Sequence, residues 1–163
     1  GFWPVYLQYS TGSSGDQLVL LPPVLRHFEQ HRQKHFWEAE AGGRIYARFD
    51  AQHIIVEKVT GPKGSDRRSR YSFAFDKLAA QREIDAMHKV GLHYLGDWHT
   101  HPQRRPLPSW RDKTTMASRV RNSKHDLNGL VFIIVGVSAF PAGLAVILHD
   151  GASIVHLKGG LST

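Results

Sequence analysis

One segment, residues 92–121, constrains the fold most strongly, because its pattern predicts a strand, a loop and a helix in direct succession. The apolar and aromatic residues 92–95 lead into His99 and His101, which we expect at the end of a β-strand. Alternate residues of a strand point to the same face, so the two imidazoles should lie side by side. The residues that follow are rich in proline, which ends strand pairing and predicts a loop.

The loop leads to a predicted helix start. Ser109 is typical of a helix N-cap, Asp112 lies in the first turn, and the helix should extend to about Arg121. A loop of this length can fold Asp112 back beside His99 and His101. Two histidines and one aspartate are the ligand set of an open tetrahedral zinc site, whose fourth position goes to water. The histidines could instead be a chance pair on the surface, and Ser-x-x-Asp could be only a helix capping box. The occurrence of His-x-His-Pro, a proline-rich loop and Ser-x-x-Asp in this order favours the metal site.

The composition excludes several other classes of protein. The chain has no cysteine, which excludes disulfides, cysteine-protease chemistry, thiolate zinc sites and zinc deaminases. It has neither an apolar run of membrane-spanning length nor a signal-peptide pattern, so we expect a cytoplasmic protein without membrane contact. The formal net charge of +7 indicates an acidic partner surface or some nonspecific affinity for nucleic acid, and a soluble basic surface explains it equally well.

The remaining residues predict an α/β sandwich with a mixed sheet. Strands are expected at residues 2–6, 17–21, 39–49, 52–59, 71–75, 130–137, 144–149 and 153–157. Two further helices are expected at residues 22–36 and 76–90, a basic loop at 60–70 and a loose end at 158–163. At 163 residues, one domain is the default expectation.

Two patterns outside residues 92–121 have structural explanations. His27, His31 and His35 recur at helical spacing without acidic neighbours, so we interpret them as a solvated polar stripe rather than as metal ligands. The pair Gly42–Gly43 lies inside a predicted strand, where glycines indicate that something approaches the backbone closely.

The residues that alternate with the two strand-end histidines have other expected roles. Trp98 and Thr100 should point to the opposite face and pack there. Asp97 is a weaker candidate for orienting one of the histidines.

Residues 99–112 resemble the JAMM motif of the MPN-plus metalloproteases, His-x-His-x(7)-Ser-x-x-Asp, with every spacing intact. That family also carries an upstream glutamate in Glu-x-Gly-Gly-x-hydrophobic, which residues 40–45 (Glu-Ala-Gly-Gly-Arg-Ile) match. The order of elements is similar to the MPN fold from about residue 18 to residue 157. The resemblance implies a single MPN domain over residues 1–163, with a mixed central β-sheet flanked by helices.

The resemblance also implies a mechanism. Zn²⁺ on His99, His101 and Asp112 would hold a water that attacks the substrate carbonyl. Glu40 would be the general base that takes the proton of this water and passes it to the leaving amine. Ser109 would donate its hydroxyl to the oxyanion of the tetrahedral intermediate.

Residues 67–73 and 94–102 resemble a bacterial subgroup of that family, the deconjugating isopeptidases of type II CBASS anti-phage operons. These proteins occur beside a cyclic-nucleotide synthase (CD-NTase) and a fused activating and conjugating enzyme. The resemblance implies a protein substrate, a CD-NTase or ubiquitin-like C-terminal tail conjugated to a target lysine, with the fused enzyme as a further partner. Two alternatives stay open: a metal-free MPN scaffold, and a metal-dependent nucleic-acid enzyme, which the lack of Mg²⁺-binding carboxylate clusters disfavours.

Overall fold

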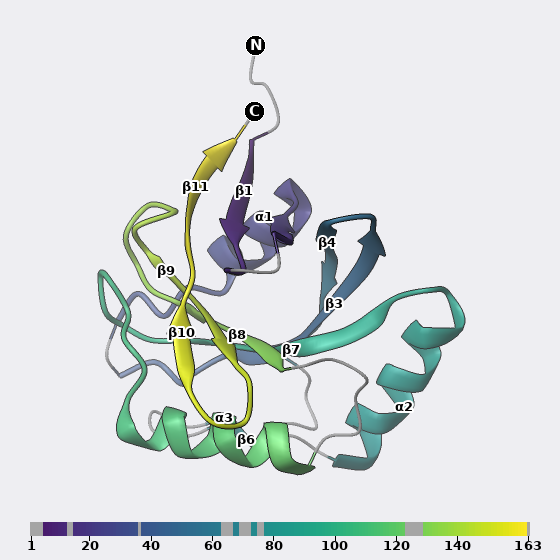
Figure 1. The fold of residues 1–163 in the computed structure, drawn as a ribbon. Coiled ribbons are helices and arrows are strands. Elements are labelled where there is room, and N and C mark those ends of the chain that lie inside the picture. The colour runs from purple at the N-terminus through teal and green to yellow at the C-terminus, as the bar shows by residue number, and fades with distance from the viewer. Residues whose placement is uncertain are drawn as a thin grey trace.

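A computed structural model of the chain describes residues 5–12, 15–35, 37–62, 67–68, 73–74, 77–122 and 129–162. Nine strands form one sheet in the order β10-β9-β8-β7-β3-β4-β2-β1-β11 (Figure 1). Their bounds are β1 Tyr6–Ser10, β2 Gln17–Leu20, β3 Gly42–Asp50, β4 His53–Val59, β7 His93–Thr100, β8 Leu130–Val135, β9 Leu144–His149, β10 Ile154–His156 and β11 Lys158–Ser162. A separate pair consists of β5 Arg67–Arg68 and β6 Phe73–Ala74. The helices are α1 Pro22–Gln30, α2 Lys77–Lys89 and α3 Trp110–Asn122.

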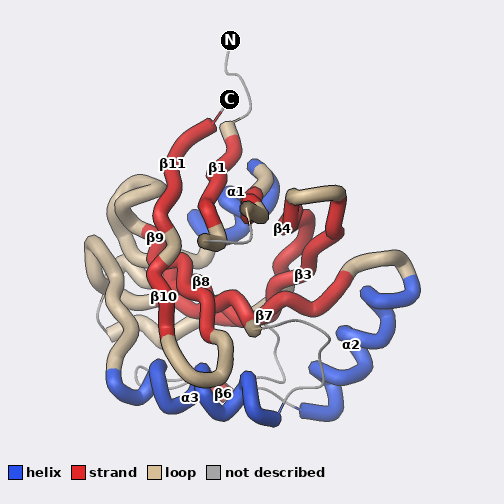
Figure 2. The backbone as a smooth tube through the Cα atoms, in the orientation of Figure 1, coloured by secondary structure: helices blue, strands red, loops and turns tan. Residues whose placement is uncertain are grey.

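Helices cover both faces of the sheet. Helix α1 packs Val24 and Phe28 into the core cluster that contains Trp98 of β7. Helix α3 packs Met116 onto a second cluster formed by β8 and β9. Helices α2 and α3 lie together below the strands in the orientation of Figure 2, away from α1. The predicted α/β sandwich with a mixed sheet is therefore confirmed, since β2–β4 and β7–β8 pair in parallel and the other neighbours pair antiparallel.

The β7–β8 pair lies in the interior of the sheet, beside the central strand β3. All six residues of β8 are buried, which agrees with the continuous apolar, β-branched sequence of this strand. The strand that carries the histidines, β7, lies between β8 and β3 and is therefore supported on both edges. Among the described residues, no helix combines the length and the apolar character needed to cross a bilayer.

Two predicted boundaries are wrong. Residues 158–162 form β11, which pairs with β1 through contacts more than 140 residues apart in sequence, as in Tyr6 opposite Ser162. Helix α1 ends at Gln30 rather than at residue 36, because the buried Gln33 side chain donates to the Glu38 carbonyl at 2.7 Å and holds a turn there. Most of the predicted strands at 2–6 and 71–75, and most of the basic loop, lie outside the described residues.

The prediction of a solvated histidine stripe is wrong for its first two members. His27 Nε2 lies 2.6 Å from the Gly61 carbonyl oxygen, and its ring stands edge-on to Trp98 with centroids 5.5 Å apart. His31 Nδ1 lies 2.9 Å from the His27 carbonyl oxygen. These imidazoles therefore belong to the packing between α1 and the sheet, and only His35 is exposed.

The close approach predicted at the glycine pair is confirmed. A Cβ on Gly43 would lie 1.6 Å from the Thr60 carbonyl oxygen, which accepts a hydrogen bond from the Arg44 amide at 3.2 Å. We expect Gly43→Ala to lower the free energy of unfolding by about 1–3 kcal/mol or more, because backbone must move to make room. Urea unfolding measures this, with Gly160→Ala as the control, since nothing lies within 4 Å of a Cβ there. Equal stability of the two variants would contradict the contact.

Candidate metal centre

Strand pairing brings three of the five predicted site residues, Glu40, His99 and His101, to one point. Gly42 of β3 pairs with His99 of β7 in antiparallel register. Continuing that register places Glu40, two residues before Gly42, opposite His101, two residues after His99. The His101 amide donates to the Val135 carbonyl at the end of β8 at 2.9 Å, which holds the backbone beyond the strand end. Glu40 and the two histidines therefore share one face of the sheet.

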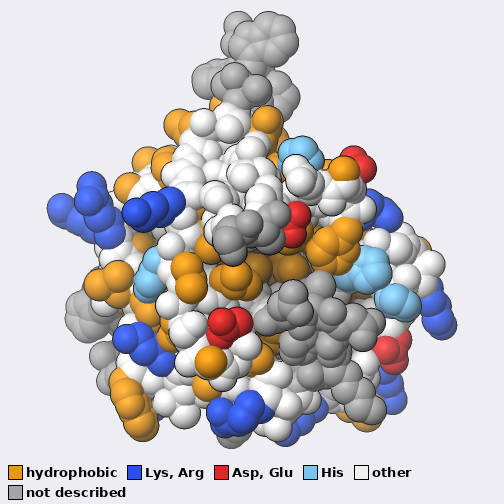
Figure 3. All heavy atoms as spheres, in the orientation of Figure 1, with side chains coloured by type: hydrophobic (Ala, Val, Ile, Leu, Met, Phe, Trp, Pro, Cys, Tyr) orange, Lys and Arg blue, Asp and Glu red, His pale blue; other side chains and the backbone are white. Residues whose placement is uncertain are grey.

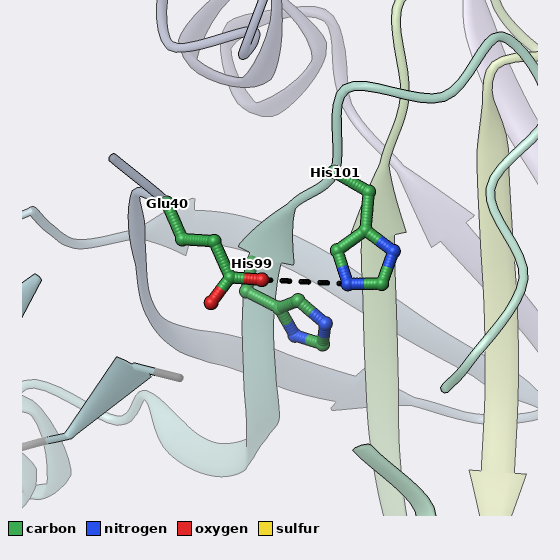
Figure 4. Close-up of side chains that lie close together, drawn as sticks. All are labelled: Glu40, His99 and His101. Carbon is green, nitrogen blue, oxygen red and sulfur yellow. Dashed lines mark ion pairs between the residues drawn. The ribbon is translucent and has the colours of Figure 1, made fainter. Parts of the chain in front are cut away.

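The side chains converge as well as the backbone. One ligand atom each from Glu40, His99 and His101 lies within 4.8 Å of the others, and their side chains point toward one another in Figure 4. His101 Nε2 lies 3.4 Å from Glu40 Oε1 and 3.2 Å from Asp112 Oδ2. His99 Nε2 lies 3.1 Å from Asp112 Oδ1. The two oxygens of the Asp112 carboxylate thus each lie beside the Nε2 atom of one imidazole.

The histidine nitrogens fit a metal ion. His99 Nε2 is buried and has no hydrogen-bond partner among the described residues, although the Asp112 carboxylate is nearby. His101 Nδ1 lies 3.4 Å from Gln103 Oε1, so a proton on Nδ1 would leave the Nε2 lone pair directed at the cluster. An unpartnered buried nitrogen beside a second imidazole and a carboxylate is the donor chemistry of a transition-metal site.

Ser109 and Asp112 form a reciprocal capping box at the start of α3. The Ser109 amide donates to Asp112 Oδ2 at 2.8 Å, and the Asp112 amide donates to Ser109 Oγ at 3.0 Å. The same Oδ2 atom lies 3.2 Å from His101 Nε2. The capping and metal-site interpretations of Ser-x-x-Asp are therefore compatible, because the cap holds the carboxylate beside the histidines.

The charges of the cluster are strongly coupled. Burial raises the pKa of Glu40 to about 6, against the opposing effect of the two histidines. Burial also disfavours ionisation of Asp112, but the neighbouring His101 and His99 imidazoles outweigh it and hold the pKa of this carboxyl well below its usual range. Burial disfavours a charged His101 too, yet the neighbouring Asp112 raises the pKa of this imidazole. A carboxylate with a pKa near neutrality beside a cationic site suits proton transfer.

The opposite face of β7 is packed, as predicted. Trp98 and Thr100 are fully buried, and the indole N–H donates to the Thr60 carbonyl at 2.9 Å. Thr100 Oγ1 accepts from the Ala41 amide at 3.0 Å and donates to Gln33 Oε1 at 3.3 Å. Sequence reasoning missed Gln33, which ties the segment before Glu40 to β7, because no spacing rule singles out a glutamine after a helix.

Asp97 has partners other than the histidines. The Tyr94 hydroxyl donates to its Oδ1 at 2.7 Å, and Arg119 Nε of α3 lies 3.2 Å from its Oδ2. Both carboxylate oxygens are thus occupied by these two residues rather than by an imidazole. Arg119 is a second residue that sequence reasoning missed.

Comparison with known families agrees with this geometry. The profile of prokaryotic homologues of the JAB domain matches residues 21–146, a span that includes the whole cluster. The chain belongs to this family. It is a JAMM-type hydrolase, and the resemblance found in its sequence is confirmed.

Several relatives carry informative names. A CD-NTase/cGAS isopeptidase of Pseudomonas aeruginosa is 31% identical over 138 residues, which cover 80% of this chain and 85% of that protein. A CD-NTase/cGAS isopeptidase of Vibrio cholerae is 27% identical, covering 77% of this chain and 80% of that protein. A probable metalloprotease of Sinorhizobium fredii is 32% identical, covering 52% and 55% respectively.

A solved structure supports the fold alone. The solution structure of a Desulfitobacterium hafniense protein superposes with a TM-score of 0.60 and 24% identity. The match covers 84% of this chain and 87% of that one. The expected MPN-type α/β fold is therefore confirmed.

Proposed function

We propose that the chain is a zinc-dependent isopeptidase that removes a CD-NTase or ubiquitin-like protein from a target lysine. The observation that carries this proposal is the convergence of two imidazoles and two carboxylates at the end of β7. The names of the relatives supply the substrate class, a CD-NTase, which the geometry alone does not define.

His99, His101 and Asp112 would hold the metal. Two imidazoles and one carboxylate are a frequent ligand set of catalytic zinc, and they leave one position open for chemistry. A bound zinc ion supplies Lewis acidity, which makes a water nucleophilic near neutral pH and polarises the scissile carbonyl. Glu40 lies against His101 at 3.4 Å and stays available for proton transfer.

The chain's own residues would move the proton. Glu40 takes a proton from the water whose oxygen bonds to the carbonyl carbon. When the carbon–nitrogen bond breaks, Glu40 gives that proton to the lysine nitrogen, which leaves as a neutral amine. The tail leaves as a carboxylic acid, which loses its proton to solvent and becomes a carboxylate. The raised pKa of Glu40, about 6, reflects its burial and makes both transfers accessible near neutrality.

Ser109 would stabilise the oxyanion with its hydroxyl hydrogen, since its oxygen lone pair already accepts from the Asp112 amide. We expect Ser109→Ala to keep one zinc and to lower kcat by about 10²–10³. Ser109→Gly separates the oxyanion role from the capping role. It removes the hydroxyl, yet glycine at an N-cap lowers helix stability by only a few tenths of a kcal/mol. Steady-state kinetics and chemical unfolding of both variants test this. An unchanged kcat in Ser109→Gly would leave only the capping role.

The proposal covers the whole chain as one catalytic domain, residues 1–163. It is supported by the single nine-stranded sheet, whose strands begin at Tyr6 and end at Ser162. With a CD-NTase as substrate, the reaction that supplies it is conjugation of the CD-NTase tail to lysine by an activating and conjugating enzyme. We place both reactions in the bacterial cytoplasm.

The alternatives have less support. Membership of a hydrolase family and the complete residue set favour an enzyme over a metal-free scaffold. On the face shown in Figure 3, lysine and arginine side chains are spread around the periphery and alternate with apolar and histidine surface. Nucleic-acid enzymes usually gather their basic residues in a continuous patch, and the described residues on this face form none.

The experiment is the cleavage of a purified CD-NTase–lysine conjugate, followed by gel and intact mass. Wild-type enzyme should release the CD-NTase with a free C-terminal carboxylate and regenerate the lysine amine. Chelator-treated enzyme should release none until zinc is added. Wild-type enzyme that binds zinc but cleaves only other ubiquitin-like conjugates would reject the CD-NTase substrate.

A further inference from the structure

A second polar contact joins α3 to β7, some distance from the Asp112 carboxylate. Asp97 lies two residues before His99 on β7, so their side chains share one face. Arg119 follows Asp112 by about two helical turns and therefore lies on the same side of α3. Arg119 Nε lies 3.2 Å from Asp97 Oδ2, while the Asp112 oxygens lie 3.1 and 3.2 Å from the histidines. Polar contacts thus hold the helix to the strand at both ends.

The acceptor of this contact is held in a defined orientation. Asp97 is 8% exposed, and the hydroxyl of Tyr94, on the same strand, donates to its Oδ1 at 2.7 Å. Its other oxygen faces Arg119, whose side chain is 26% exposed. The carboxylate is therefore part of the strand's rigid surface, and α3 docks on it through a directional bond.

Apolar packing alone would not define the position of α3 so closely. Met116, between the two polar contacts, is 2% exposed and packs against Phe132 and Ile134. Burial of this kind is non-directional and tolerates small rotations and shifts of a helix. A hydrogen-bonded ion pair depends on both distance and angle, so it restricts them.

We propose that the Asp97–Arg119 ion pair is a positioning contact that sets where Asp112 stands relative to His99 and His101. This inference rests on the metal centre proposed above. Ligand groups must stay within roughly 0.5 Å and 10–20° of their productive geometry, and Asp112 is delivered from the first turn of a helix that follows an exposed loop. A second fixed point two turns away removes the freedom of α3 to rotate or slide.

A purely stabilising role predicts something different. Replacing a largely buried ion pair by apolar side chains is often neutral or favourable for stability. Metal affinity and the stability of the metal-free protein are therefore separable readouts. A positioning role must appear in the metal affinity of protein that is still folded.

The test uses Arg119→Met and Asp97→Asn, with Arg121→Met as the matched control, an exposed arginine two residues further along α3. Zinc affinity is measured by competition with a chromogenic chelator, Co²⁺ geometry by its absorption spectrum, and thermal unfolding on metal-free protein. We expect Arg119→Met and Asp97→Asn each to bind zinc about 10–100-fold more weakly, and Arg121→Met to stay within about twofold of wild type. Arg119→Lys should recover part of the loss.

The outcomes separate this inference from the metal centre. If wild type binds zinc and both variants keep its affinity and Co²⁺ spectrum, the positioning role is wrong while the centre stands. If wild type binds no zinc, the centre itself is wrong, and this inference with it. Should Arg119→Met fail to fold, the nearly isosteric Asp97→Asn decides the question by the same criteria.

Discussion

Glu40→Gln should lower kcat by about 10²–10⁴ and leave the zinc content at one equivalent. The amide keeps the size of the carboxylate and can still form hydrogen bonds, but it cannot accept the proton of the attacking water. Glu40 lies 3.4 Å from His101 Nε2, so it is close enough to act beside the metal. Single-turnover cleavage and metal analysis of the same preparation measure both quantities.

Glu38→Gln is the matched control, because it makes the same chemical change two residues earlier. Among the described residues, the Glu38 carboxylate accepts a hydrogen bond from the His35 amide at 3.1 Å and from no other group. It should retain wild-type turnover. Glu40 also has a carboxylate oxygen within 4.8 Å of ligand atoms of both site histidines, which would suit a metal ligand. Loss of zinc in Glu40→Gln would assign it that role, and residual turnover above about a tenth of wild type would reject it as the base.

His99→Ala should lose the metal and with it all measurable turnover. Loss of a residue that supports a ligand typically costs about 10–100-fold in metal affinity, so loss of the ligand itself should cost more than about 100-fold. The buried Nε2 of His99 is the structural reason, because it makes no hydrogen bond among the described residues and lies 3.1 Å from the Asp112 carboxylate, the other proposed ligand. Dialysis against a chelator of known affinity, followed by metal analysis, measures the loss.

His93→Ala is the control for this variant. His93 begins the same strand, is exposed, and its ring lies beside the rings of Phe49 and His88. Zinc content and turnover should match wild type. Stoichiometric zinc in folded His99→Ala would remove that residue from the ligand set and contradict the centre as proposed.

The site could be predicted from the sequence because its parts are local. The strand end, the proline-rich loop and the helix cap lie within 14 consecutive residues, 99–112. Alternation on a strand and the chemistry of an N-cap are sufficient to bring His99, His101 and Asp112 together. Glu40 depends on a long-range strand pairing, and only the motif around the glycine pair indicated it.

The features that escaped prediction depend on long-range contacts. Strand β11 exists because β1 lies beside it, and its glycines give no strand signal of their own. Helix α1 stops shortly before the buried Gln33, whose side chain holds a turn, although the helical spacing continues through His31 and His35. The Asp97–Arg119 pair joins β7 to α3, and the spacing of residues within either element does not predict how the two pack together. In each case tertiary contacts override or add to the local pattern.

The most direct test of the proposed zinc centre is a zinc titration of chelator-stripped enzyme, with cleavage of the conjugate as the readout. Stripped protein should be inactive, and activity should rise linearly with added zinc to a plateau at about one equivalent per chain. Full activity in the stripped protein, or a folded protein that binds no zinc, would contradict it.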